Sequence, residues 1–246
     1  MGKILPPFLK SIRVLDDRVD GAAFPFNRFP FLAEDGFELA FTAPVTMFVG
    51  ENGTGKSTVL EALAALAGFH AGGGSASHQL HQTSDQEPSA LAPALRASWL
   101  PKVSKGFFFR ADTFAEVAQY IDEEGVGSEG GPLRERSHGE AFLDLFAERF
   151  PTRERCLYLL DEPEAAFSPS RQLAFLRLLR EWELSGNAQI IIVTHSPILM
   201  SYPGASLLEF DGNGIHPVSF EETEHVRVTK GFLNNPEKYL KDILGE

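Results

Sequence analysis

The feature that most constrains this chain is a glycine-rich loop at residues 50–57, which reads Gly-Glu-Asn-Gly-Thr-Gly-Lys-Ser. Its spacing is that of a phosphate-binding loop, in which glycines let backbone amides turn toward a phosphate group. Residues 46–49 before the loop are typical of a strand, and residues 57–66 carry leucines at helical spacing up to Gly68. A strand, a loop and a helix in this order predict an α/β protein that binds phosphate at a helix amino terminus.

Each position of this loop has an expected role toward a nucleoside triphosphate. Lys56 would reach the β- and γ-phosphates, Ser57 would hold Mg²⁺ through its hydroxyl, and Thr58 would support the α-phosphate. The residues of this segment that we expect to bind the nucleotide are Gly50, Glu51, Asn52, Gly53, Thr54, Gly55, Lys56, Ser57 and Thr58. The loop alone leaves ATP and GTP as alternatives.

A second candidate segment is the apolar run 156–160, which leads directly into Asp161 and Glu162. A run without alternation is typical of a central strand that is covered on both faces, as in a parallel sheet. Ligands of such sheets bind at the carboxyl ends of the strands. We therefore expect Asp161 to join the magnesium shell, directly or through water, and Glu162 to polarise the attacking water. Taken alone, the segment could also be a strand that ends in solvated acids.

The third candidate segment is the apolar run 189–194, which ends in His195. The same sheet edge would place this imidazole near the γ-phosphate, where it could sense or hydrogen-bond the phosphate and the water. A structural histidine is the alternative when this strand end is taken by itself.

The rest of the chain alternates predicted strands with predicted helices. Further strands are expected at 11–15, 37–41 and 106–111, and helices at 112–121, 137–150 and 169–184. Residues 71–93 lack periodicity and are expected to form a loop, while a hairpin around 211–214 precedes two short helices that end at Leu244. This alternation predicts an α/β layered domain.

Composition narrows the function classes. The 34 acidic and 22 basic residues give a formal net charge of -12, so no overall positive field attracts nucleic acid or anionic lipid. The one cysteine, Cys156, excludes an intrachain disulfide framework and fits a reducing compartment. Neither a signal peptide nor an apolar run of the ~18 residues that a membrane span needs is found. We expect a cytoplasmic protein without a membrane segment of its own.

In this order, the three motifs resemble Walker A, Walker B and the switch histidine of the ATP-binding cassette (ABC) ATPases. The resemblance implies a P-loop NTPase with a mixed, mainly parallel core sheet flanked by helices, antiparallel N-terminal strands and a helical subregion. It implies one domain over 1–246, with the helical subregion at about 70–150 between Walker A and Walker B. It further implies that ATP and Mg²⁺ bind and that Lys56, Glu162 and His195 are catalytic.

The family's signature motif corresponds to residues 136–140, Arg-Ser-His-Gly-Glu, of which Ser137 and Gly139 match the usual sequence. In the family this motif caps the γ-phosphate of ATP bound to the opposite subunit, so the resemblance implies an ATP-dependent homodimer in which Ser137 and Gly139 bind nucleotide. From the residues alone, Ser137 and Glu140 form a helix capping box. Both interpretations can hold together.

Other family positions depart from the pattern. The strand expected to end in the Q-loop glutamine ends instead near Arg110, which could lie near phosphate or pair with Asp112. Ser168 stands where transporters usually have the D-loop aspartate. Phe24 and Phe26 are candidates for adenine stacking, with core packing as the alternative.

The match most resembles stand-alone bacterial ATPases labelled predicted ATPase or AAA-family ATPase, which are closer to RecF and SMC proteins than to transporters. The Ser-His-Gly-Glu and Asp-Glu-Pro-Glu motifs carry this resemblance. The expected function is an ATP-hydrolysing, dimerising molecular switch. The alternatives are the nucleotide-binding subunit of an ABC transporter and a nucleotide-dependent scaffold with negligible turnover. The sequence names no further protein partner, and nucleic acid enters by analogy only.

Overall fold

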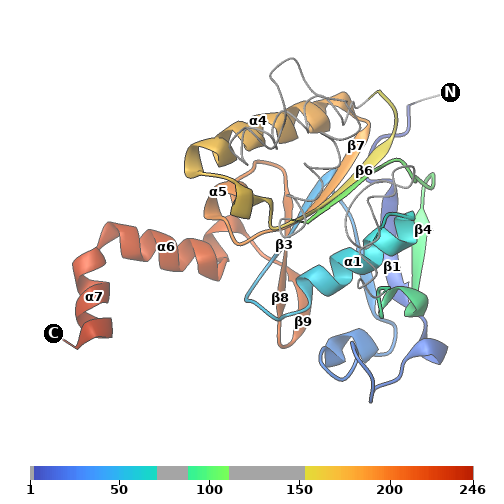
Figure 1. The fold of residues 1–246 in the computed structure, drawn as a ribbon, viewed down its shortest axis with the longest axis horizontal. Helices are drawn as coiled ribbons and strands as arrows, with labels where there is room; N and C mark the ends of the chain where they lie inside the picture. Colours follow the sequence, from blue (N-terminus) through green and yellow to red (C-terminus); the bar gives the residue numbers. More distant parts are fainter. Residues whose placement is uncertain (1–2, 71–87, 111–152, 246) are drawn as a thin grey trace, which may run out of the picture.

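The computed structural model describes residues 3–70, 88–110 and 153–245 of the chain. Its main sheet has six strands in the order β5-β6-β7-β3-β8-β9 (Figure 1). Five of these strands run parallel, and β9 pairs antiparallel with β8. The strands are β3 (Val45–Val49), β5 (Gly106–Arg110), β6 (Cys156–Asp161), β7 (Ala188–Val193), β8 (Ser206–Asp211) and β9 (Gly214–Pro217).

A second, smaller sheet is antiparallel and has the order β2-β1-β4. Its strands are β1 (Leu9–Val14), β2 (Glu38–Ala40) and β4 (Leu95–Trp99). The sequence analysis predicted β1 and β2 but not β4. The missed signal was a weak alternation in which Leu95, Ala97 and Trp99 are separated by polar residues. With β4 added, the antiparallel N-terminal strands of the predicted fold class are confirmed.

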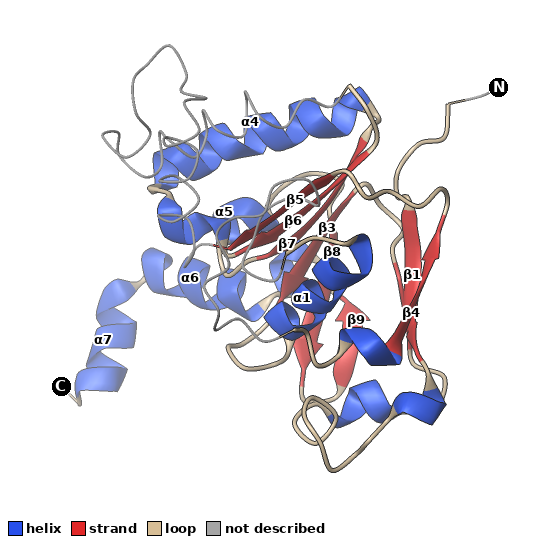
Figure 2. Cartoon of the chain, turned by 45° about the vertical axis from the view of Figure 1, so that its right-hand side comes forward, coloured by secondary structure: helices blue, strands red, loops and turns tan. Residues whose placement is uncertain are grey.

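The helices cover both faces of the main sheet (Figure 2). Helix α1 and the small sheet lie on one face, and α4 and α5 lie on the other. The helices are α1 (Lys56–Ala67), α4 (Pro169–Ser185), α5 (Pro197–Met200), α6 (Glu224–Asn234) and α7 (Pro236–Leu244). Short 3-10 turns occur at Asp16–Arg18, Pro30–Ala33, Ala92–Ala94, Pro163–Ala166 and Phe220–Glu222.

Two hydrophobic cores explain why the central strands are continuously apolar. Along β6, Leu157 and Leu159 join the core under α1, whereas Tyr158 and Leu160 join the core under α4. A strand buried on both faces needs apolar side chains at every position, which is the pattern that predicted a parallel sheet. The mixed, mainly parallel sheet flanked by helices is therefore confirmed.

The predicted helices at 57–66 and 169–184, the hairpin and the two C-terminal helices are also confirmed. The predicted helices at 112–121 and 137–150 lie outside the described residues, as does most of the predicted loop at 71–93. In the stretch assigned to a helical subregion, the described part contains strands β4 and β5. Among the helices that the structure describes, none combines the length and apolar character needed to cross a bilayer.

The C-terminal helices differ from the others because they leave the sheet (Figure 1). Helix α6 begins against the body of the protein, where Thr223 and Val226 are buried. Farther along, Val228, Leu233 and most apolar side chains of α7 are exposed. The start of α6 is thus held firmly beside the carboxyl ends of the central strands.

Candidate active site

The glycine-rich loop joins β3 to α1 at the centre of the main sheet, and its glycines are required by close packing. Gly50 has a φ of 121°, and a Cβ there would collide with the carbonyl oxygen of Phe210. Gly55 has a φ of 99°, and a Cβ there would lie 3.2 Å from the ring of Phe29. Such backbone angles strongly favour glycine. No side chain caps the amino terminus of α1 at Gly55, so its first amides are suited to an anion.

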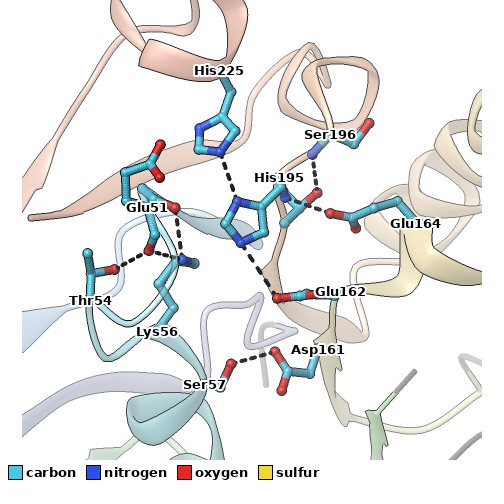
Figure 3. A network of polar contacts seen from close by, with 12 residues as sticks. Glu51, Thr54, Lys56, Ser57, Asp161, Glu162, Glu164, His195, Ser196 and His225 are labelled. Atoms are coloured by element: carbon cyan, nitrogen blue, oxygen red, sulfur yellow. Dashed lines mark hydrogen bonds and ion pairs between the residues drawn. The ribbon is translucent and has the colours of Figure 1, made fainter. Parts of the chain in front are cut away.

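Lys56 points back into this loop (Figure 3). It is buried, with 4% of its surface exposed. Its Nζ donates to the carbonyl oxygens of Gly50 at 2.8 Å and of Glu51 at 2.6 Å. Burial lowers the pKa of Lys56, and the charges of Glu162 and Asp161 oppose this shift. An ammonium group has three N–H donors, so the loop fixes the amine while leaving one donor for a phosphate.

Ser57 and Asp161 form the next part of the site. The Ser57 hydroxyl donates to Asp161 Oδ1 at 3.0 Å, joining the start of α1 to the end of β6. Burial raises the pKa of Asp161 to about 6, while the Ser57 hydrogen bond opposes the rise. A hydroxyl and a buried carboxylate are oxygen ligands that suit Mg²⁺, which usually keeps only one or two protein ligands beside phosphates and water. These residues therefore fit the predicted magnesium site.

Glu162 follows Asp161 in a left-handed backbone conformation, with φ 49° and ψ 51°. Such angles are uncommon for residues other than glycine and occur often at functional sites. The Glu162 N–H donates to the Val193 carbonyl at 3.0 Å, which ties this turn to β7. The Glu162 side chain is half-exposed, and its Oε1 lies 3.5 Å from His195 Nε2 (Figure 3).

His195 lies just beyond the end of β7, between the loop and α6. Its Nδ1 is 2.8 Å from Nε2 of His225. Its own Nε2 is buried and has no hydrogen-bond partner among the described residues. Burial, assisted by the charge of Lys56, lowers the pKa of His195 below its ordinary value, which favours the neutral imidazole.

Polar contacts from neighbouring turns hold the backbone around His195. Glu164 Oε1 accepts the His195 backbone N–H at 2.6 Å, and burial raises the pKa of Glu164. The Ser196 N–H donates to Thr194 Oγ1 at 3.0 Å, and the Ser196 hydroxyl accepts two backbone N–H groups of α5. The carboxyl end of β7 is thus held by Glu164 from the turn after β6 and by the hydrogen bonds of Ser196 at the start of α5.

The sequence analysis missed three residues of this site: Phe29, Glu164 and His225. Glu164 lies within the Asp-Glu-Pro-Glu motif, so the motif itself was a signal. Phe29 belongs to an aromatic cluster with no pattern that points to the loop. No local signal identifies His225, because it comes from a helix 30 residues beyond His195.

The remaining predicted residues are placed as follows. Arg110 ends β5 in register with Asp161, and its Nη1 lies 2.5 Å from Glu61 Oε1 of α1. Phe26 is buried in the core, whereas Phe24 is half-exposed and packs edge-on against Phe29 at 6.1 Å. Ser137, Gly139 and Asp112 lie outside the described residues.

Three neighbouring strands therefore bring the predicted groups to one edge of the sheet. The strand order places β3 beside β7 and β7 beside β6. The loop after β3, the carboxylates after β6 and the histidine after β7 consequently meet at one place, which Figure 3 shows. Such an arrangement can bind a polyphosphate, hold a hard cation and activate a water molecule.

Comparison with known proteins gives the family. Residues 26–89 match a family model described as "AAA domain", and residues 141–201 match one described as "AAA domain, putative AbiEii toxin, Type IV TA system". The chain is 33% identical over 193 residues to the hemin import ATP-binding protein HmuV of Streptomyces coelicolor, covering 68% of this chain and 66% of that protein. The chain belongs to the ABC-type ATPases.

Other relatives of this ABC-type ATPase are more distant. It is 23% identical over 208 residues to the translation initiation factor RLI1 of Saccharomyces cerevisiae, covering 81% of this chain and 31% of that protein. It thus spans less than two thirds of either curated relative. The solved structure of cbiO1 from Clostridium perfringens, part of the ABC transporter complex cbiONQ, is 17% identical with a TM-score of 0.43. That match covers 86% of this ABC-type ATPase and 91% of the cbiO1 chain.

Proposed function

We propose that this chain binds ATP with Mg²⁺ and hydrolyses it to ADP and phosphate. The observation that carries the proposal is the 3.0 Å contact between Ser57 and Asp161, which joins the phosphate-binding loop to the acidic end of β6. Beside it lie a buried lysine, a half-exposed glutamate and a histidine whose Nε2 lies 3.5 Å from that glutamate. At one place the site therefore has a lysine that can contact phosphate, two oxygen ligands for Mg²⁺ and a carboxylate that can polarise a water molecule.

In this proposal the protein acts mainly by positioning and by charge. Lys56 and the amides of residues 50–58 would bind the phosphates, and Ser57 and Asp161 would hold Mg²⁺, which would supply positive charge beside the phosphate oxygens. Glu162 orients and polarises a water, whose oxygen forms the new bond to the γ-phosphorus as the bond to ADP breaks, and the proton that this water loses passes to the Glu162 carboxylate. His195 donates a hydrogen bond from Nε2 to the γ-phosphate or to that water.

The proposal extends to a homodimer that forms with ATP. Two chains would close around two nucleotides, each binding the γ-phosphate of the other through Ser137 and Gly139. This part rests on the signature-like sequence at 136–140 and on the family. Loss of the γ-phosphate would remove contacts across the interface and allow the two chains to separate, which makes the protein a switch. A cytoplasmic location is part of the same proposal.

The test combines ATPase assays with size-exclusion chromatography in the presence of Mg²⁺ and ATP. Wild type should hydrolyse ATP, Lys56→Ala should neither hydrolyse nor dimerise, and Glu162→Gln should dimerise without turnover. The matched control is Glu154→Gln. Glu154 is an exposed carboxylate that lies just before the first residue of β6, at the end of the strand away from Asp161 and Glu162. The switch is refuted if Glu162→Gln hydrolyses normally and neither it nor wild type dimerises with ATP.

A transporter subunit is a second candidate because one relative is named a hemin import ATP-binding protein. This function would require a membrane partner that stimulates hydrolysis. Full ATPase activity by the isolated chain would count against that dependence. A scaffold with negligible turnover is the other alternative, and it predicts ATP-dependent dimers with no phosphate release by wild type. A role with nucleic acid rests on analogy with relatives.

A further inference from the structure

The contact between His195 and His225 has no place in the hydrolytic scheme above. Their facing nitrogens, Nδ1 of His195 and Nε2 of His225, lie 2.8 Å apart, and their ring centroids are 4.9 Å apart. In a hydrogen bond between two neutral imidazoles, one nitrogen must carry the proton and the other must accept it. The direction of this bond therefore decides where His195 carries its own proton.

The surroundings of His195 select one direction. From the phosphate-binding loop, Glu51 and Lys56 face this ring, and from the turn after β6, Glu162 and Glu164 do so. Glu164 is engaged with the backbone of His195, whereas Glu162 Oε1 lies 3.5 Å from Nε2. A protonated Nε2 faces that carboxylate favourably, while a bare Nε2 would direct a lone pair at it. The proton of His195 accordingly belongs on Nε2, which leaves Nδ1 as an acceptor.

His225 is well placed to be the donor. It lies in the first turn of α6, between the buried residues Thr223 and Val226. The Thr223 hydroxyl donates to the Phe220 carbonyl at 2.8 Å, and Ser219 and Glu222 form a capping box just before it. These contacts fix the backbone that carries His225, and the half-buried ring of His225 lies against the ring of His195.

We propose that His225 is a positioning residue for His195. Its Nε2–H donates to Nδ1 of His195 and holds the His195 proton on Nε2, directed toward Glu162 and the site of the γ-phosphate. A hydrogen bond to the remote nitrogen of a functional histidine sets both its tautomer and its ring orientation. The inference rests on the proposed function for the role of His195, but the tautomer itself exists without nucleotide.

The first experiment measures the tautomer of His195 by nitrogen NMR of the nucleotide-free full chain at pH 8, with the His195 signal assigned by its loss in His195→Gln. Wild type should show Nε2–H. The His225→Gln protein, whose amide can still donate, should show the same tautomer, and His225→Phe should show a mixture. The inference is overturned if wild-type His195 carries its proton on Nδ1.

The second experiment measures kcat and KM for ATP. Loss of one hydrogen bond that orients a reacting group should lower kcat of His225→Phe about fivefold to tenfold with little change in KM. His225→Gln should recover most of that loss. The matched control is His216→Phe, an exposed histidine of β9 that contacts Glu209 and Asp211. An unchanged kcat for His225→Phe, or an equal loss in His225→Gln, contradicts the inference.

The two experiments separate this inference from the proposed function. If wild type does not hydrolyse ATP but His195 carries Nε2–H, the proposed function fails and the contact stands. If wild type hydrolyses ATP and His195 carries Nδ1–H, the proposed function stands and the role of His225 as donor fails.

Discussion

The phosphate-binding loop and the surroundings of His195 face each other in one site but are built differently. In the loop, the Lys56 amine is oriented by the carbonyls of Gly50 and Glu51, which belong to the same short segment. His195 depends on side chains from two other elements, Glu164 after β6 and His225 in α6. The lysine is thus oriented by its own segment, whereas His195 is positioned by side chains that are distant from it in the sequence.

This difference predicts how each half responds to change. In the loop, each side chain or glycine is itself part of the expected binding surface, so a substitution should abolish binding or distort the loop. Around His195, several neighbouring side chains together position one histidine. Replacing any one of them should therefore reduce activity less than a substitution in the loop. The following predictions test that contrast.

The largest expected effect is that of Lys56→Ala on ATP binding. Hydrogen bonds to charged groups contribute about 1.5–3 kcal/mol, so the affinity for ATP should fall roughly 10- to 100-fold. Isothermal titration calorimetry measures this change directly. Lys102→Ala, which removes an exposed lysine before β5, should bind ATP like wild type. Equal affinities for wild type and Lys56→Ala would show that Lys56 does not contact the bound ATP.

Gly50→Ala should destabilise the fold even without nucleotide. Its positive φ and the close carbonyl of Phe210 leave no room for a methyl group. The expected loss in the free energy of unfolding is about 1–3 kcal/mol, measured by urea denaturation. The control is Gly21→Ala, because a Cβ at Gly21 meets no heavy atom within 4 Å. Equal stability of the two variants would show that the positive φ of Gly50 and its contact with β8 do not constrain the loop.

The buried carboxylate of Asp161 should make stability depend on pH. Its pKa rises from 3.8 to about 6 on folding, so the folded state holds the proton more tightly and loses stability as the pH rises through this interval. Without Mg²⁺ or nucleotide, Asp161→Asn should be more stable than wild type at pH 8 by about 1–3 kcal/mol, a difference that vanishes below pH ~4. Thermal unfolding at both pH values measures it, with Asp35→Asn as an exposed control. A constant difference would refute the explanation.

The smallest effect is expected at Glu164. Glu164→Ala removes the acceptor of the His195 backbone N–H and should lower kcat about fivefold, since one hydrogen bond is lost. Glu164→Gln keeps an acceptor oxygen and should remain closer to wild type. Steady-state ATPase assays distinguish them. If Glu164→Ala loses as much activity as Lys56→Ala, the contrast between the two halves of the site is wrong.

The same contrast explains what the sequence could reveal. The loop, the acidic end of β6 and the position of His195 were predicted because each is a contiguous pattern that begins or ends at a strand. Glu164, His225 and the ring of Phe29 act through tertiary contacts, and the spacing of residues along the chain does not encode those contacts. Strand β4 was missed because its short alternation has exposed or half-buried residues at most positions.

The most direct test of the central claim is the rate of phosphate release from saturating Mg²⁺ and ATP by wild type and Glu162→Gln. A residue that polarises the attacking water should contribute roughly 10²- to 10⁴-fold to kcat. Glu162→Gln should therefore release phosphate slower by that factor while binding ATP with an affinity like that of wild type. Equal rates for the two proteins would contradict the assignment of this sheet edge as a hydrolytic site.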